Sequence, residues 1–124
     1  RLGKAILELG GNNAIIITEN ANLDMAIRGA LFGAVGTAGQ RCTTTRRLII
    51  HEKVYSDVKN RLKKAYSQLS IGNPLDSKNH VGPLIDQNAV SLYLNALSEI
   101  VKQGGKFVVE GGVLKGKGYN SGCY

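Results

Sequence analysis

The sequence is short of the residues that build several common classes of protein. Its 124 residues include two cysteines, two histidines and no tryptophan, and only 6% are aromatic. Cys42 and Cys123 lie far apart in the sequence, so they predict neither a disulfide framework nor a set of metal ligands. No apolar run approaches the roughly 18–20 residues of a membrane-spanning helix, and the first residues carry no secretory signal. We therefore expect no membrane partner and no metal.

The charge balance is basic, with 16 Lys and Arg against 9 Asp and Glu. Lys59, Arg61, Lys63 and Lys64 lie beside an apolar stripe, as on the solvent-facing side of a helix. Proteins that bind nucleic acids usually add aromatic residues for stacking or a recognisable fold signature. We expect no nucleic-acid partner, and the composition predicts a soluble, intracellular α/β domain.

Strand and helix patterns alternate along the chain. Residues 14–18 form a β-branched run typical of a strand covered on both faces. The helix that follows Asn22, its expected N-cap, is apolar nearly all round and should be buried. The alternation predicts an α/β fold with an open, mostly parallel sheet and flanking helices. The expected strands are 14–18, 46–51 and 106–110, and the expected helices are 23–35, one carrying residues 58–69, and 86–103 with Val90, Leu94, Leu97 and Val101 inside.

Three glycines, Gly29, Gly33 and Gly36, share one side of the first predicted helix. Each glycine costs a helix roughly 1 kcal/mol relative to alanine, so the stripe needs a packing reason. Of the two explanations, we favour tight packing against the sheet over direct contact with a ligand.

Cys42 has the local setting of a reactive thiol. It follows a glycine-containing helix end, and Arg41 beside it is a cation that would stabilise the nucleophilic thiolate. The alternative is a buried structural cysteine. A dyad of Cys42 with His51 is conceivable, although nothing in the spacing brings the two together, and we expect His80 at the surface.

Glu8 lies between two leucines, just before a glycine pair. Burial there would favour the protonated carboxyl and suit the group to general-base work near neutral pH. The alternative is a residue of an edge strand whose side chain points to water.

Four stretches together resemble the NAD(P)-dependent aldehyde dehydrogenases. Residues 7–14, LELGGNNA, resemble the glutamate signature of that family, and residues 39–43, GQRCT, resemble its cysteine signature. Residues 71–76 and 82–85 resemble two further stretches, in the same order. Within the family, residues 10–16 and 36–44 are most similar to the antiquitin branch, the α-aminoadipic semialdehyde dehydrogenases of lysine breakdown.

The resemblance implies a mechanism with two catalytic residues. Cys42 would attack the aldehyde, a hydride would leave for the nicotinamide of NAD or NADP, and Glu8 would prime the water that hydrolyses the thioester. The backbone at Glu8, Leu9 and Gly10 would line the cofactor. Arg41 and Thr43 would face the aldehyde, and an arginine there suits a semialdehyde that carries a carboxylate.

The departures from the family imply a piece of its catalytic domain. The resemblance covers residues 1–112, whereas 113–124 form a Gly/Lys-rich tail that departs from it. The dinucleotide-binding domain and the upstream Asn of the oxyanion hole are missing, so we expect the isolated chain to be inactive. The parent enzyme would be a homotetramer of the cytoplasm or the mitochondrial matrix. Two alternatives stay open, an inactive fragment or interaction module of the same fold, and a small hydrolase using Cys42 and His51.

Overall fold

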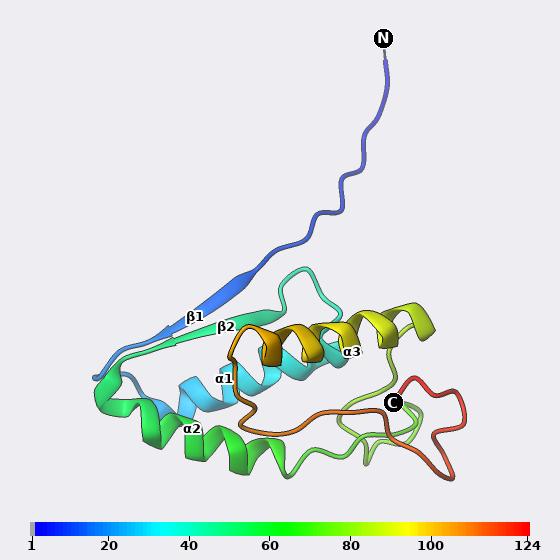
Figure 1. Ribbon diagram of the computed structural model, residues 1–124. Coiled ribbons are helices and arrows are strands. Elements are labelled where there is room, and N and C mark those ends of the chain that lie inside the picture. Colours follow the sequence, from blue (N-terminus) through cyan, green and yellow to red (C-terminus); the bar gives the residue numbers. More distant parts are fainter. Residues whose placement is uncertain (1) are drawn as a thin grey trace.

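The computed structural model describes residues 2–124 and has an α/β architecture (Figure 1). Two strands pair in parallel, and three helices accompany them. The predicted parallel α/β fold is confirmed. The elements are β1 (Asn13–Ile17), α1 (Leu23–Val35), a short 3-10 turn η1 (Gly36–Gly39), β2 (Thr45–Ile50), α2 (Glu52–Tyr66) and α3 (Gln87–Lys102).

The core joins β1, α1 and α2. Ile17, Ile27 and Val58, one from each element, form its buried centre. Helices α1 and α2 lie on the same side of the two strands (Figure 1), which is how apolar residues of the two layers meet. Ile15 and Ile50 of the sheet pack at the margin of this cluster.

The sheet is covered on one face rather than two. Ile17 is only 1% exposed, whereas its neighbour Ile16, on the opposite face, is 70% exposed. The same asymmetry holds for α1, in which Ile27 is buried while Met25 and Phe32 are exposed. The expectations of a strand covered on both faces and of a fully buried helix are therefore wrong, because α1 and α2 cover only the face that carries Ile17.

The helix ends follow the capping rules. Asn22 Oδ1 accepts the N–H of Met25 at 3.1 Å, which confirms the predicted N-cap of α1. Helix α2 begins earlier than the apolar pattern indicated and ends at Tyr66, so Leu69 lies beyond it. Helix α3 agrees with its prediction to within a residue at each end. Of its expected inner face, Val90 is buried, but Leu94 and Val101 are exposed.

The glycine stripe packs closely at two of its three positions. A Cβ at Gly33 would collide with the hydroxyl of Thr45 on β2, and one at Gly36 would lie 3.0 Å from the guanidinium of Arg41. A Cβ at Gly29 would meet open space. Tight packing against the sheet is therefore confirmed for Gly33 alone, since Gly36 packs against the Arg41 side chain of the loop and Gly29 packs against nothing.

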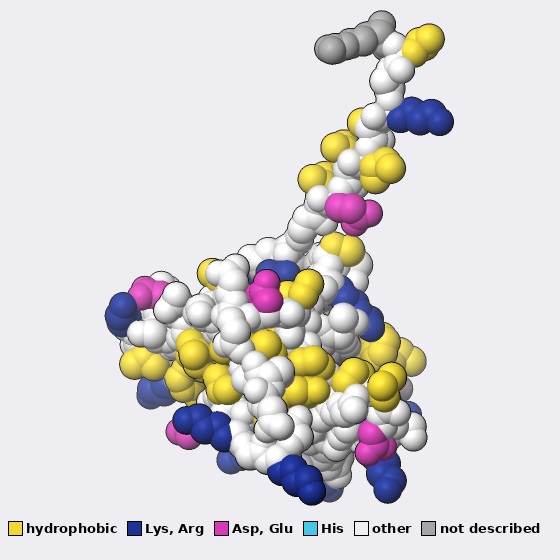
Figure 2. Space-filling model, turned by 90° about the vertical axis from the view of Figure 1, so that its right-hand side faces the viewer, with side chains coloured by type: hydrophobic (Ala, Val, Ile, Leu, Met, Phe, Trp, Pro, Cys, Tyr) yellow, Lys and Arg dark blue, Asp and Glu magenta, His cyan; other side chains and the backbone are white. Residues whose placement is uncertain are grey.

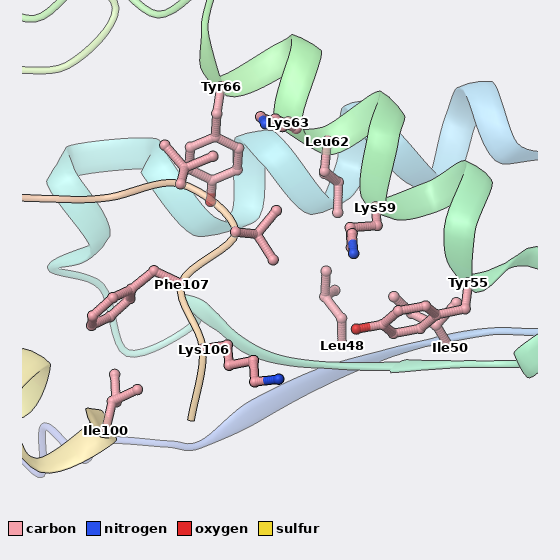
Figure 3. Close-up of a pocket in the computed structure, with 12 residues that line it drawn as sticks. Leu48, Ile50, Tyr55, Lys59, Leu62, Lys63, Tyr66, Ile100, Lys106 and Phe107 are labelled. Carbon is pink, nitrogen blue, oxygen red and sulfur yellow. The ribbon is translucent and has the colours of Figure 1, made fainter. Parts of the chain in front are cut away.

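Residues 106–110 do not form the third predicted strand. They cross an open groove of about 450 Å³ that faces β2 and α2, with Leu48, Leu62 and Tyr66 among its other lining residues (Figure 3). A strand exists only when a neighbour pairs with its backbone, and within residues 2–124 no strand pairs with this segment. Its short apolar run, Phe107–Val109, was therefore not sufficient to make it a strand.

The glycine-rich tail packs back onto the body, which its lack of an apolar pattern did not predict. The hydroxyl of Tyr119 donates to the carbonyl of Ile71 at 3.0 Å. The N–H of Leu84 donates to the carbonyl of Cys123 at 2.8 Å, and the Cys123 side chain is buried. The tail thereby braces the loop that precedes α3.

The basic face of α2 is exposed, as expected, but one of its cations links two helices. Arg61 donates to Asp57 on α2 and to Asp24 on α1, each at 2.8 Å. These contacts, with Asp57 contributing most, raise the pKa of the Arg61 guanidinium. No helix within residues 2–124 is long and apolar enough to cross a membrane.

Candidate active site

Cys42 lies on the loop that leads from α1 through η1 into β2, and its side chain is exposed. The alternative of a buried structural cysteine is therefore wrong for Cys42. It describes Cys123 instead, which is buried and accepts a hydrogen bond from Gln87 at 3.3 Å. The thiol of Cys42 is open to a small molecule arriving from solvent.

Thr44 closes the Cys42 loop from inside. Its buried hydroxyl accepts the N–H of Arg41 at 3.0 Å and donates to the carbonyl of Gly39 at 2.9 Å. The N–H of Thr44 also donates to the Arg41 carbonyl at 3.2 Å. Because each of these groups is paired, the loop keeps one shape around the exposed thiol.

Asn13, at the start of β1, binds the same loop from outside. Its side-chain Nδ2 donates to the carbonyl of Cys42 at 2.7 Å and to that of Thr44 at 3.2 Å. The chain just before Asn13 passes so close that a Cβ on Gly11 would lie 3.1 Å from the Cys42 carbonyl oxygen. Gly11 of the first matched stretch therefore permits this close approach to the cysteine loop.

Strained backbone precedes the cysteine. Thr37 and Ala38 adopt left-handed conformations with φ of 54° and 53°, and Gly39 follows with φ of 73°. A non-glycine residue in this region costs roughly 1–2 kcal/mol, so neighbouring contacts must hold it.

Gln40 supplies part of that support. Its Nε2 donates to the carbonyls of Thr37 and Pro83 at 3.1 and 3.4 Å, and its Oε1 accepts the N–H of Ile85 at 2.9 Å. The cysteine stretch and the fourth matched stretch therefore touch.

The Arg41 side chain turns toward α1. Its Nε donates to the hydroxyl of Thr37 at 2.7 Å, and its guanidinium carbon lies 5.4 Å from the ring centre of Phe32. Within residues 2–124 its two terminal nitrogens donate no hydrogen bond. Thr43 is exposed beside Cys42. Both residues predicted to face the aldehyde thus flank the thiol in sequence and are accessible.

The carboxylate half of the predicted site lies elsewhere. Residues 2–12 form an extended arm that leaves the body of the molecule and exposes apolar side chains (Figures 1 and 2). Glu8, Leu9 and Gly10 are all exposed on it. The expectation that Glu8 is buried is wrong in this structure, because no other segment covers the arm there. Only Gly11 and the residues after it reach the cysteine loop.

The structure excludes a dyad of Cys42 with His51. The two residues lie beyond opposite ends of β2, whose six residues span roughly 20 Å. His51 instead caps α2, with its Nδ1 accepting the N–H of Lys53 at 3.3 Å. His80 is exposed, as predicted, and its Nδ1 accepts the N–H of Ser70 at 3.0 Å.

Two backbone donors remain free beside the thiol. The N–H groups of Cys42 and Thr43 donate to no acceptor in the part of the chain that the structure describes. The carbonyls that precede them in their peptide groups are both occupied, by the Thr44 N–H and by Asn13. Such fixed, unoccupied N–H groups can stabilise an oxygen that gains negative charge.

Sequence reasoning gave no role to Asn13, Gln40 and Thr44, although Asn13 and Gln40 stand inside matched stretches and Thr44 directly follows one. For Gln40 and Thr44 a chemical signal was available, because an amide or hydroxyl within a few residues of a reactive cysteine can satisfy the loop's backbone groups. The contacts of Asn13 with Cys42 and of Gln40 with Ile85 join residues 29 and 45 positions apart, so only the fold could identify them.

Comparison with known proteins identifies the family. All of residues 1–124 match the aldehyde dehydrogenase family. The chain is 55% identical over 114 residues to the α-aminoadipic semialdehyde dehydrogenase of Bos taurus. That match covers 92% of this chain and 21% of the bovine protein. The chain thus spans about a fifth of the length of the curated relatives it matches.

Solved structures agree with the match in sequence. A crystal structure of an NADP-dependent enzyme of E. coli has a TM-score of 0.85 and 36% identity, covering 90% of this chain and 23% of that one. The 1-pyrroline-5-carboxylate dehydrogenase of Thermus, with bound NAD, has a TM-score of 0.79 and 35% identity, covering 89% and 21%. The chain belongs to the aldehyde dehydrogenase family.

Proposed function

We propose that this chain carries the nucleophile segment of an NAD-dependent aldehyde dehydrogenase that oxidises a semialdehyde with a carboxylate, such as α-aminoadipic semialdehyde. One observation carries the proposal, the exposed Cys42 on a hydrogen-bonded loop with two free N–H groups beside it. Membership of the family and the 55% identity to the bovine enzyme support the reaction class and the substrate.

The chemistry begins at the sulfur. The Cys42 thiolate adds to the aldehyde carbon, and the carbonyl oxygen takes the negative charge, which the N–H of Cys42 stabilises. The thiohemiacetal then loses a hydride and becomes a thioester. Glu8 takes a proton from water, and the resulting hydroxide attacks the thioester carbon. The carboxylic acid leaves, and the thiolate of Cys42 is regenerated.

The nicotinamide supplies the hydride acceptor when it is bound. The residues proposed to hold that end of the cofactor are Glu8, Leu9 and Gly10, whose exposed backbone leaves room for a flat ring. A Cβ at Gly10 would meet nothing within 4 Å, which fits such a role. NADP stays an alternative to NAD, because one of the similar structures is described as NADP-dependent.

Arg41 and Thr43 are the proposed substrate-binding residues. The terminal nitrogens of Arg41 have no partner among residues 2–124, and a guanidinium binds a carboxylate through two parallel hydrogen bonds. The anchor on Thr37 through Nε leaves those nitrogens available. This arrangement favours a semialdehyde with a carboxylate over an aliphatic aldehyde.

The wider expectations form part of the same proposal. The full-length enzyme would be a homotetramer, with residues 1–112 in its catalytic domain and 113–124 as a Gly/Lys-rich tail that packs against it. It would work in the cytoplasm or the mitochondrial matrix, because both compartments keep Cys42 reduced.

A second candidate function is a chain of this fold without catalysis of its own, serving as an interaction module. The exposed arm favours it, because Glu8 is not held near Cys42 by any described residue. Both candidates predict that the isolated 124 residues produce no NADH from aldehyde and NAD. They differ for a full-length protein that contains these residues, which produces NADH only if the first candidate is correct.

The test uses a chimeric enzyme, the bovine relative in which the 114 matched residues of this chain replace their counterparts. Arg41→Ala should lower kcat/KM for the semialdehyde roughly tenfold or more while leaving an aliphatic aldehyde nearly unchanged. Arg46→Ala is the control, since Arg46 is also exposed but lies on β2. An unchanged preference in Arg41→Ala would refute the assignment of the substrate. Retention of activity in Cys42→Ala would refute the proposed function as a whole.

A further inference from the structure

The peptide groups around Cys42 are fixed by a residue from another element. Asn13 is the first residue of β1, and its Nδ2 reaches the carbonyls of Cys42 and Thr44, on either side of Thr43. One amide nitrogen with two hydrogens can serve both acceptors at once.

The consequence follows from the planarity of the peptide bond. In a trans peptide the N–H points away from the carbonyl, and the described chain contains no cis peptide. When Asn13 holds the carbonyl of Cys42, it therefore also fixes the direction of the Thr43 N–H. That N–H is one of the two free donors beside the thiol.

Asn13 is close enough to act because the chain before it contains glycine. The backbone at Gly11 approaches the Cys42 carbonyl so closely that a Cβ there would lie only 3.1 Å from it. The glutamate stretch and the cysteine stretch are thus joined at Asn13, five residues after Glu8.

We propose that Asn13 is a positioning residue, which acts on the reaction through the Cys42 loop. It sets the orientation of the Cys42–Thr43 peptide group, keeps the Thr43 N–H available beside the thiol, and connects the loop to the arm that carries Glu8. The proposal rests on the proposed function, because the orientation matters only when Cys42 is the nucleophile. It predicts an effect on the chemical step rather than on cofactor binding.

The neighbouring Asn12 provides a matched control. Its side chain makes no hydrogen bond in the described structure, and only its backbone carbonyl is used, by Arg47 at 2.6 Å. Asn13→Leu and Asn12→Leu therefore make the same chemical change one residue apart. Asn13→Asp, which keeps the shape but loses the donor, is the second variant if the leucine disturbs packing.

In the chimeric enzyme, Asn13→Leu and Asn13→Asp should lower kcat about tenfold or more while KM for NAD stays unchanged. Asn12→Leu should leave both within about twofold, and Asn13→Gln, which keeps the donor, should recover part of kcat. An equal loss in the Asn12 and Asn13 variants, or a rise in KM alone, would overturn the positioning role. Loss of activity in Cys42→Ala together with full activity in Asn13→Leu would overturn this inference alone.

A measurement on the 124-residue chain tests the geometry without turnover. Hydrogen exchange at the N–H of Thr44, which donates to the Arg41 carbonyl, should be about tenfold faster in Asn13→Leu than in Asn12→Leu. Exchange at Val58, in the core, should be equal in the two variants. Equal exchange at Thr44 in both would contradict the proposal, even if the enzyme is active.

Discussion

The loop that carries Cys42 and the arm that carries Glu8 differ in how they are held. The loop is bound from inside by Thr44 and from outside by Asn13 and Gln40. On the arm, residues 2–10 are exposed, and Figure 1 shows them leaving the body. The β1–α1–β2 unit, with the segment before α3 that bonds Gln40, therefore builds the nucleophile half of the site. The position of the carboxylate must depend on contacts that these residues do not supply.

The largest expected effect is on NADH formation, and it separates the roles of Cys42 on the loop and Glu8 on the arm by the reaction step that each performs. In the chimeric enzyme, Cys42→Ala should reduce NADH formation more than about a thousandfold, including the first turnover, because no thiohemiacetal forms. Glu8→Gln should keep a rapid first burst of NADH and lose the steady-state rate, because only thioester hydrolysis needs the base. Rapid-mixing absorbance measurements distinguish the two. A burst in Cys42→Ala would contradict the division of roles.

The second effect is on stability and compares the covered and the bare face of β1. Ile17→Ala should lower the free energy of unfolding by roughly 2–5 kcal/mol, since Ile17 is 1% exposed in the core cluster with Ile27 and Val58. Ile16→Ala, on the bare face of the same strand, should cost less than about 0.5 kcal/mol. Urea denaturation of the 124-residue chain measures both values. Equal losses would mean that both faces of β1 are covered in solution.

A third effect compares the arm and the loop directly. Trypsin cleaves after Lys4 on the arm and after Arg41 on the loop, and both side chains are exposed. Cleavage after Lys4 should be about tenfold faster or more, because a protease must unfold its substrate locally and only the loop resists. Mass spectrometry of the early fragments gives the two rates, and the chain in urea is the control. Equal rates in the native chain would show that the hydrogen bonds around Cys42 do not persist.

The smallest effect is a pH dependence in the layer beneath the loop. Burial raises the pKa of Tyr66, which lies on α2, above its ordinary value near 10 because it disfavours the phenolate. The unfolded chain therefore loses this proton first, so stability is unaffected below pH 10 and decreases as the pH rises above it. Tyr66→Phe should remove that decrease. Urea midpoints of both proteins at pH 9 and 10.5 test it, and identical pH slopes would contradict it.

Local patterns in the sequence were sufficient to predict those helices and strands whose stabilising contacts lie near in the chain. The capped helix after Asn22 and the strand before His51 follow from periodicity and capping, which act over a few residues. Residues 106–110 have the same kind of pattern but no pairing neighbour within residues 2–124, so they stay irregular. A strand is a property of two segments, and one segment cannot specify it.

The same division applies to the candidate site, of which the local features were predictable and the long-range contacts were not. The signatures placed Cys42 on a loop after a helix, and the structure has it there, exposed. Burial of Glu8 could not be inferred from its neighbours, because it depends on what covers the arm. The roles of Asn13 and Gln40 needed the fold, since their partners at Cys42 and Ile85 are distant in sequence.

One measurement tests the central claim, that Cys42 is the nucleophile of an aldehyde oxidation. The Glu8→Gln chimeric enzyme is mixed with NAD and the semialdehyde, quenched in acid and digested with trypsin. The account predicts the mass of the acyl group on the peptide of residues 42–46, bound as a thioester that hydroxylamine removes. A burst of NADH without that adduct, or with the acyl group on another residue, would contradict the claim.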